Sequence, residues 1–390
     1  MTPMSESIRS IAIAGAWGYI GRKLLDAAVH LGLRVYAYDP APVPADVDPS
    51  RCTLVSDPAE FYRLPVELYH LALHPQHRQP ALGILLDRAR HEPLLILNEK
   101  PMAEPETPQA CAATVAAVEA TQAIMLFDFL ELYDPMTQAI VEHLSRSGPV
   151  QIDAVRLYRG KDREDPRRPR NYKKMVHIQY QETVHCIAFL LHLLGSLRGG
   201  LRAVLDQGLT VTAHAQPYAP PNPEAYPYVV DGQVTYRLQL GDVQVDGRTD
   251  FKAGAPFAKT KTITGRAGGR PFVVEADYLE GAKRLAIDGR DMGFARDASG
   301  YEHILRTLAA WRQRVSPERL MRGVYPNPRF ARLTYQISSV LWRSCWTGRP
   351  IALRSYDELL GFAADFAAAV PQFARYAAPA PTAASRPPQS

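Results

Sequence analysis

Short apolar runs and longer amphipathic stretches alternate along the first third of the chain. Five runs have the length and composition of buried strands: residues 11–14, 33–38, 68–73, 94–97 and 124–129. Three stretches between them carry apolar residues at helical spacing: residues 22–31, 79–90 and 107–120. Strands that alternate with helices across short loops indicate a doubly wound parallel sheet, so we expect an α/β fold in this part.

The rest of the chain has a different pattern. Five short strands, several of them separated by glycine turns, are expected at residues 151–158, 234–240, 243–250, 260–264 and 272–275. Their pattern predicts an open, mostly antiparallel sheet with one solvated face. Helices are expected at 181–194, 301–315 and 327–346, and Gly195 should end the first of them.

This change of pattern divides the chain into domains. We expect a first domain over residues 1–130 and an α+β domain over 131–376, because a single core stops growing before a chain reaches 390 residues. Residues 377–390 are rich in proline, alanine and serine, so we expect this tail to be disordered.

Composition excludes several function classes. The net charge of +5 is spread along the chain, so we expect no nucleic-acid partner. The four cysteines form no CxxC pair, which indicates neither a metal site nor a disulfide framework and suits a reducing cytosol. We see no secretory signal and no apolar run long enough to span a membrane. A cytoplasmic protein without a membrane partner is therefore expected.

A glycine-rich turn joins the first predicted strand to the first predicted helix. Its glycines, Gly15, Gly18 and Gly21, allow backbone N–H groups to approach a pyrophosphate, whose charge the helix N-terminus stabilises. The spacing is GxxGxxG rather than the commoner GxGxxG, and Trp17 makes the loop bulkier. The turn predicts a dinucleotide site, and the alternative is a strand-turn-helix without a ligand.

Asp39 follows the second predicted strand, 18 residues after Gly21. This is the position of a carboxylate that accepts hydrogen bonds from ribose hydroxyls. A carboxylate there repels a 2′-phosphate, so we expect NAD rather than NADP. The competing interpretation makes Asp39 a turn residue before Pro40.

The tripeptide Glu99-Lys100-Pro101 follows the apolar run at 94–97. The carboxyl ends of strands are where open α/β sheets bind ligands. The alternative is a surface turn with a solvated Glu-Lys pair.

With these pieces in this order, the chain resembles the Gfo/Idh/MocA oxidoreductases, the glucose-fructose oxidoreductase and inositol dehydrogenase family. Four stretches within residues 8–352 carry the likeness: the glycine turn, residues 71–77, the tripeptide and residues 181–195. The resemblance implies an N-terminal Rossmann domain and a C-terminal α+β domain with an open antiparallel sheet. The substrate would lie between them, against the nicotinamide.

The resemblance also implies residue roles. Lys100 would bind the reacting oxygen, His185 would be the acid/base, and Glu99 would lie near the nicotinamide ribose. Gln181 stands where the family has an aspartate, and an amide cannot titrate. Histidine suits proton transfer near neutrality and a lysine stabilises an alkoxide, so the pair fits alcohol oxidation. The alternative for His185 is a hydrogen-bonded core histidine.

The arginine-rich segment, residues 156–174, holds nine Lys or Arg against three Asp or Glu. It is interpreted as a solvated face, as an anion-binding wall that includes Arg159 and Lys173, or as a subunit contact. Tyr172 and His177 are alternative proton acceptors. The candidate catalytic and substrate residues are Lys100, Arg159, Tyr172, Lys173, Gln181 and His185. The candidate cofactor contacts are Gly15, Trp17, Gly18, Tyr19, Ile20, Asp39, Leu73, His74, His77, Glu99 and Lys100.

The resemblance leads us to expect an NAD-dependent oxidoreductase that acts on a secondary alcohol of a sugar, cyclitol or glycoside, assembled as a homodimer or homotetramer. Three alternatives stay open. The first is a non-catalytic nucleotide sensor. The second is a reductase of an imine or double bond, because the glycine turn also resembles that of dihydrodipicolinate reductases. The third is a redox-neutral sugar elimination with recycled NAD.

Overall fold

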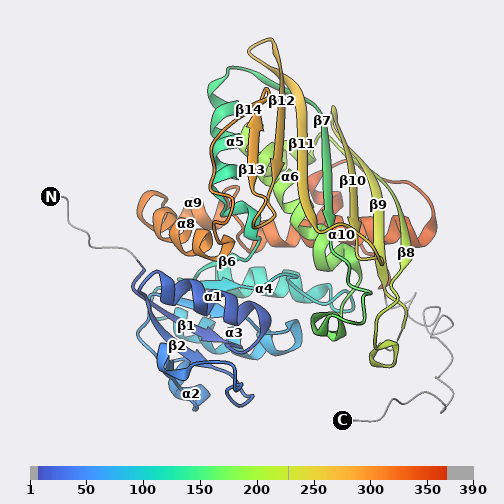
Figure 1. The fold of residues 1–390 in the computed structure, drawn as a ribbon. Coiled ribbons are helices and arrows are strands. Elements are labelled where there is room, and N and C mark those ends of the chain that lie inside the picture. The colour runs from blue at the N-terminus through green and yellow to red at the C-terminus, as the bar shows by residue number, and fades with distance from the viewer. Residues whose placement is uncertain (1–7, 227, 367–390) are drawn as a thin grey trace, which may run out of the picture.

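The computed structural model describes residues 8–226 and 228–366, so the predicted tail at 377–390 lies outside the described residues. Two sheets lie one above the other in Figure 1. The strands of the first sheet are β1 (Ser10–Ala14), β2 (Arg34–Tyr38), β3 (Thr53–Leu54), β4 (Leu68–Leu71), β5 (Leu95–Asn98) and β6 (Ile124–Phe127). They are all parallel, in the order β3-β2-β1-β4-β5-β6.

Helices connect the strands of this first sheet. They are α1 (Tyr19–His30), α2 (Pro58–Phe61), α3 (Pro75–Ala89) and α4 (Gln109–Glu119). The α/β fold with a doubly wound parallel sheet is therefore confirmed. The strand order reverses between β1 and β4, and ligands of such sheets bind outside the carboxyl ends of the strands at this reversal.

Within the described residues, the second sheet has nine strands in the order β14-β13-β12-β11-β7-β10-β9-β8-β15. They are β7 (Val150–Gly160), β8 (Leu209–Pro217), β9 (Asp231–Leu240), β10 (Val243–Asp250), β11 (Ala258–Ala267), β12 (Arg270–Asp277), β13 (Arg284–Ile287), β14 (Arg290–Asp291) and β15 (Ile351–Leu353). Only the β7–β10 pair is parallel, so the open, mostly antiparallel sheet is confirmed.

Helices cover one face of this sheet, and burial alternates along β9 and β12 as expected for strands with one solvated face. The helices of the second part are α5 (Pro135–Arg146), α6 (Val184–Leu197), α7 (Leu201–Leu205), α8 (Gly300–Arg314), α9 (Pro317–Arg322), α10 (Pro328–Thr347) and α11 (Tyr356–Leu360). Among the described residues, no helix is both long enough and hydrophobic enough to cross a bilayer.

The prediction that Gly195 ends its helix is wrong, because α6 continues to Leu197. Gly195 is buried, and a Cβ atom on it would lie 2.9 Å from Val324 and 3.0 Å from Leu201. The glycine therefore provides room for close packing rather than a helix stop.

Helix α8 returns the chain to the first sheet. Leu24 of α1 and Leu308 and Trp311 of α8 belong to one buried cluster. The N–H of Phe127 in β6 donates to the carbonyl of Pro326 at 2.7 Å. These contacts hold the second part of the chain against the first sheet, and Figure 1 shows the second sheet above the first.

Two helical glycines make a matched test of close packing. A Cβ on Gly21 in α1 would lie 2.1 Å from the carbonyl oxygen of Gly15, whereas one on the exposed Gly83 in α3 would meet nothing within 4 Å. We expect Gly21→Ala to lower the free energy of unfolding by about 1–3 kcal/mol through overpacking. Gly83→Ala should raise it by about 0.5–1 kcal/mol through helix propensity. Urea unfolding measures both, and a neutral Gly21→Ala would contradict the packing of α1 on the turn.

Candidate active site

The glycine turn forms the start of the site. Gly15 has a φ of +79°, and its N–H donates to the carbonyl of Tyr38 at 2.8 Å. A Cβ on Gly15 would lie 2.6 Å from the carbonyl oxygen of Ala72, so this position requires glycine. Helix α1 begins after Gly18 without a side-chain cap, which leaves its first N–H groups, those of Tyr19 and Ile20 included, for a ligand. The cradle fits a pyrophosphate.

Asp39 lies beside this turn, half-buried, immediately after β2. Its carboxylate accepts from the N–H of Trp17 at 3.0 Å and from the N–H of Ala41 at 2.9 Å. Each carboxylate oxygen has a second lone pair, so these two bonds leave Asp39 able to accept ribose hydroxyls.

The loop after β4 completes this edge of the sheet. Leu73 lies against Gly15, within 3.0 Å of the place that a Cβ on Gly15 would occupy. His74 is the residue that precedes α3, and the N–H of His77 donates to its carbonyl at 2.9 Å. Burial and neighbouring cations lower the pKa of His74. The candidate cofactor residues on β1, β2 and β4 therefore gather at the carboxyl ends of adjacent strands.

Arg78 binds the backbone of the tripeptide Glu99-Lys100-Pro101 through hydrogen bonds. It is buried, and its guanidinium donates to the carbonyl oxygens of Glu99 and Pro101, the latter at 2.7 Å. Burial lowers the pKa of Arg78 to about 10. The Lys100–Pro101 peptide bond is cis. The sequence carried no signal that distinguished Arg78 from the other arginines.

Glu99 turns its carboxylate into the interior. Nε2 of His70 on β4 lies 3.2 Å from Oε1 of Glu99, and Asp128, just after β6, shares a hydrogen bond with the same carboxylate. All three residues are buried. A ring nitrogen of His70 and one carboxylate oxygen each of Glu99 and Asp128 lie within 4.8 Å of one another. The carboxylate of Glu99 therefore already contacts His70 and Asp128. Its expected contact with a nicotinamide ribose stays a prediction.

A proton must be shared within this carboxyl pair. Burial raises the pKa of Glu99 and raises that of Asp128 well above its ordinary value, and the charge of Glu99 raises the pKa of Asp128 further. Asp128 is therefore the protonated partner, and it donates to Glu99. Burial lowers the pKa of His70 to about 4, so its ring is neutral.

Lys100 reaches from the first sheet to the second part of the chain. Its Nζ donates to the carbonyl of Gln181 at 2.6 Å. Gln181 lies in a π-helical turn, Gln179–Thr183, which precedes α6, and such turns are frequent at functional sites. Burial lowers the pKa of Lys100, and the charge of Glu182 opposes this effect.

His185 lies one turn beyond Gln181. It is buried, its ring packs edge-on against Phe129 with centroids 6.3 Å apart, and its Nδ1 has no hydrogen-bond partner within the described part of the chain. Burial lowers the pKa of His185 well below 6.5, and the positive charges of Arg159 and Lys100 lower it further. Its imidazole is therefore neutral at pH 7, beside Lys100.

Glu182, the residue after Gln181, is the carboxylate of this site. It is buried and accepts from Nε of Arg159 at 2.5 Å and from Nζ of Lys161 at 2.7 Å. These cations hold the pKa of Glu182 well below its ordinary value. Residues three apart share a helix face, so the i, i+3 spacing from Glu182 to His185 was the signal that could have identified it.

Arg159 is already neutralised. It also donates to Glu131, which accepts in turn from Lys261. Both carboxylates raise the pKa of Arg159, so its guanidinium serves this internal network rather than a free anion-binding wall.

The remaining candidates lie in other surroundings. The hydroxyl of Tyr172 donates to the carbonyl of Pro166 at 3.2 Å, and the residue is exposed. The ring of His177 is buried and stacks on Tyr228. Lys173 approaches the glycine turn instead, with Nζ 5.7 Å from the ring centroid of Tyr19.

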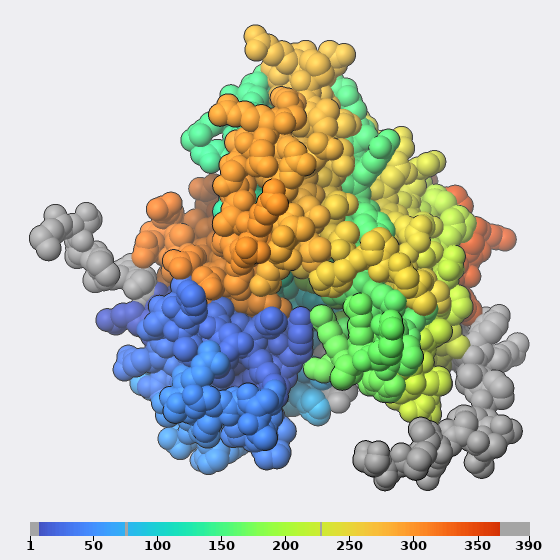
Figure 2. All heavy atoms as spheres, in the orientation of Figure 1, coloured from blue at the N-terminus to red at the C-terminus, as the bar shows by residue number. Residues whose placement is uncertain are grey.

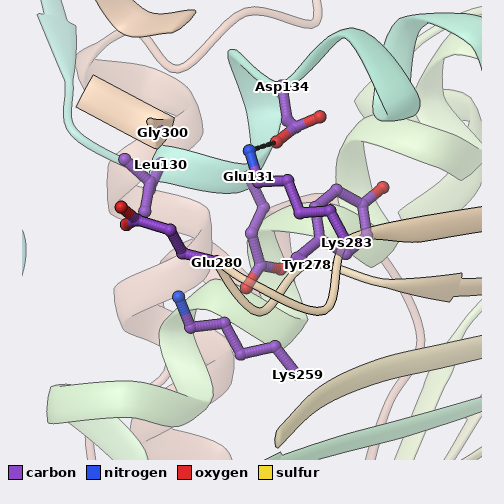
Figure 3. A pocket seen from close by; sticks show the side chains of 8 residues that line it. All are labelled: Leu130, Glu131, Asp134, Lys259, Tyr278, Glu280, Lys283 and Gly300. Carbon is purple, nitrogen blue, oxygen red and sulfur yellow. Dashed lines mark hydrogen bonds and ion pairs between the residues drawn. The ribbon is translucent and has the colours of Figure 1, made fainter. Parts of the chain in front are cut away.

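A small pocket adjoins the charged network (Figure 3). Its lining residues are Leu130, Glu131, Asp134, Lys259, Tyr278, Glu280, Lys283 and Gly300. Lys283 donates to Asp134 at 2.7 Å, while the amine of Lys259 points into the pocket. Burial and the charge of Arg159 lower the pKa of Lys259 to about 8. The pocket thus adds a weakly basic amine beside Glu131.

Comparison with known proteins shows where this architecture recurs. No protein-family model and no curated protein sequence matches the chain. Among solved structures, a myo-inositol dehydrogenase from Corynebacterium glutamicum has a TM-score of 0.64 at 17% identity and covers 89% of this chain and 99% of its own. A UDP-N-acetylglucosamine 3-dehydrogenase from Acidithiobacillus ferrooxidans has a TM-score of 0.63 at 13% identity, over 86% and 97% of the two chains.

The chain has the fold of the Gfo/Idh/MocA oxidoreductases. A further neighbour with this architecture is the super-repressor mutant of Gal80p from Saccharomyces cerevisiae, with a TM-score of 0.68 at 11% identity, over 92% and 100% of the two chains. The likeness expected from the glycine turn and the tripeptide is therefore confirmed for the fold.

The protonated Asp128 makes a testable prediction about stability. Because folding raises its pKa, the wild type loses stability as the pH rises from the ordinary carboxyl value of 3.8 toward the folded value. Asparagine cannot ionise and still donates to Glu99. We expect the melting temperature of Asp128→Asn, relative to wild type, to increase as the pH rises above 3.8. The exposed Asp87→Asn is the control, and a difference that is flat with pH would contradict the shared proton.

Proposed function

We propose that this protein is an NAD-dependent oxidoreductase that transfers a hydride between nicotinamide and a secondary alcohol or ketone of a sugar, cyclitol or glycoside. The observation that carries the proposal is the contact between Lys100 and Gln181, which brings the amine of the tripeptide within one helical turn of His185. The solved dehydrogenases with this fold support the same class of reaction.

The residues at the carboxyl edge of the first sheet fit a dinucleotide. The cradle at Gly15 and the uncapped start of α1 suit a pyrophosphate. The carboxylate of Asp39 suits ribose hydroxyls and repels a 2′-phosphate, which favours NAD over NADP. When bound there, the nicotinamide would supply the hydride chemistry.

The protein side chains would handle the substrate oxygen and its proton. In the direction of alcohol oxidation, the neutral imidazole of His185 would accept the hydroxyl proton. The amine of Lys100 would donate a hydrogen bond to the developing alkoxide. Glu182, itself held by ion pairs with Arg159 and Lys161, would act on Lys100 through its charge, and the amide of Gln181 would orient a neighbouring hydroxyl.

A second candidate is a non-catalytic nucleotide sensor. The Gal80p structures favour it, since one of them is described as a transcriptional regulator, and they share this fold. The absence of turnover with bound NAD, over a panel of sugars, uronates, cyclitols and glycosides, would select the sensor over the enzyme.

Lys100 gives the sharpest test of the proposed chemistry. We expect Lys100→Ala to lower kcat by about 10²–10³-fold, because a donor to the alkoxide acts mainly in the transition state. NAD affinity, measured by titration, should stay within about twofold, because the pyrophosphate site lies at the glycine turn. Lys23→Ala, an exposed position on α1, is the control. A fully active Lys100→Ala enzyme would remove this residue from the mechanism.

His185 should determine the acid limb of the pH–rate profile. Because its pKa lies well below 6.5, kcat/KM for alcohol oxidation should rise with pH in the acid range and already be level at pH 6.5. We expect His185→Asn to lose this limb and at least about 10²-fold in rate. If the same limb persists in His185→Asn, the proton acceptor is another residue.

A further inference from the structure

The arginine-rich segment contains more positive charge than its surroundings neutralise. Three of its nine basic residues are already explained, because Arg159 and Lys161 pair with Glu182, and Arg156 lies exposed on β7. The remaining six fall within residues 163–174, in the loop that follows β7.

The acidic residues of this loop are all used for its own structure. Asp162 accepts from the N–H of Gly254 at 2.9 Å. Glu164 pairs with Lys252 at 2.7 Å. Asp165 pairs with Arg167 at 2.9 Å. No carboxylate of the loop is left for the basic residues that follow Arg168.

Three cations therefore lack an acidic partner within the described part of the chain: Arg170, Lys173 and Lys174. The loop holds them in place, because Arg163 donates to the carbonyl of Arg170 at 3.0 Å and the buried Asn171 donates to the carbonyl of Asp165 at 2.9 Å. An anion bound between these like charges would relieve their mutual repulsion, so the arrangement suits an anionic ligand.

These cations reach the nucleotide cradle from the second part of the chain. The guanidinium carbon of Arg170 lies 4.0 Å from the ring centroid of Tyr19, the first residue of α1. Lys173 approaches the same ring at 5.7 Å. In Figure 2 the green part of the chain, which includes this loop, adjoins the blue first sheet across a hollow in the surface.

The electrostatic effects agree with this placement. Burial lowers the pKa of Lys173, and the charges of Arg170, Arg163 and Arg22 of α1 lower it further. Burial and the charge of Arg78 lower the pKa of His74, which precedes α3, and Lys173 and Lys174 add smaller effects in the same direction. The loop therefore extends from the N-terminus of α1 toward the N-terminus of α3, over the edge at which the glycine turn and the loop after β4 meet.

We propose that residues 163–174 form a strap across the nucleotide site, in which Arg170 and Lys173 bind the pyrophosphate of the dinucleotide from the side opposite to the glycine turn. This inference rests on the proposed function. Arginine and lysine at this point would add charge-assisted hydrogen bonds to the phosphate oxygens that the backbone N–H groups of the turn leave exposed. The strap would thereby enclose the cofactor and slow its release.

The test compares Arg170→Ala/Lys173→Ala with Arg167→Ala/Arg168→Ala, the matched pair on the same loop, whose side chains are exposed and pair with Asp165. The probes are ADP-ribose, which carries the pyrophosphate without nicotinamide, and adenosine, which carries no phosphate. We expect the first variant to weaken ADP-ribose binding by about ten- to a hundredfold and to leave adenosine binding unchanged. Its ADP-ribose affinity should also depend less on salt than that of the wild type.

Each other outcome overturns the proposal in a recognisable way. Unchanged ADP-ribose affinity in Arg170→Ala/Lys173→Ala, or an equal loss in the control pair, would overturn the strap alone. An equal loss of ADP-ribose and adenosine would show a structural effect without phosphate contact. A wild-type protein that binds neither probe would overturn the proposed function together with the strap.

Discussion

The hydrogen bond from Lys100 to the carbonyl of Gln181 joins the two sheets at the place where the candidate chemistry lies. Lys100 follows β5 of the first sheet, and Gln181 lies in the π-helical turn that precedes α6, in the second part of the chain. The two residues lie 81 positions apart in the sequence, so local structure alone could not bring them together. The site therefore depends on the way α8 and the segment before α10 hold the two parts together.

Two clusters of buried ionisable residues flank this contact, and the charge of each is reduced for a different reason. Glu99 and Asp128 share a proton, because two adjacent carboxylates away from water cannot both ionise. Glu182 and Arg159 instead belong to a network of opposite charges whose mutual attraction offsets their desolvation. Lys100 lies between these two environments, which is a position suited to controlling the charge of a bound oxygen.

The elements of the fold were predictable where the pattern was local. The buried strands and the helix after Gly21 follow from apolar runs and a glycine turn, and the tripeptide marked the end of β5. Helix α5 was missed although Asp134 caps it and Pro135 begins it, which is a recognisable start signal. Strand β8 was missed although its burial alternates over Leu209–Pro217. Short edge strands such as β3 have no buried pattern to detect.

The site was predictable only in part. The sequence alone determined the glycine cradle, the carboxylate after β2 and the lysine after β5, because each follows from the residues beside it. Tertiary structure decided that Arg78 supports the tripeptide, that Glu182 supplies the carboxylate near Lys100, and that Asp128 keeps its proton. These properties arise from burial and from charges on segments that are far apart in the sequence. The order of strands in the sheet, rather than sequence spacing, brings such groups together.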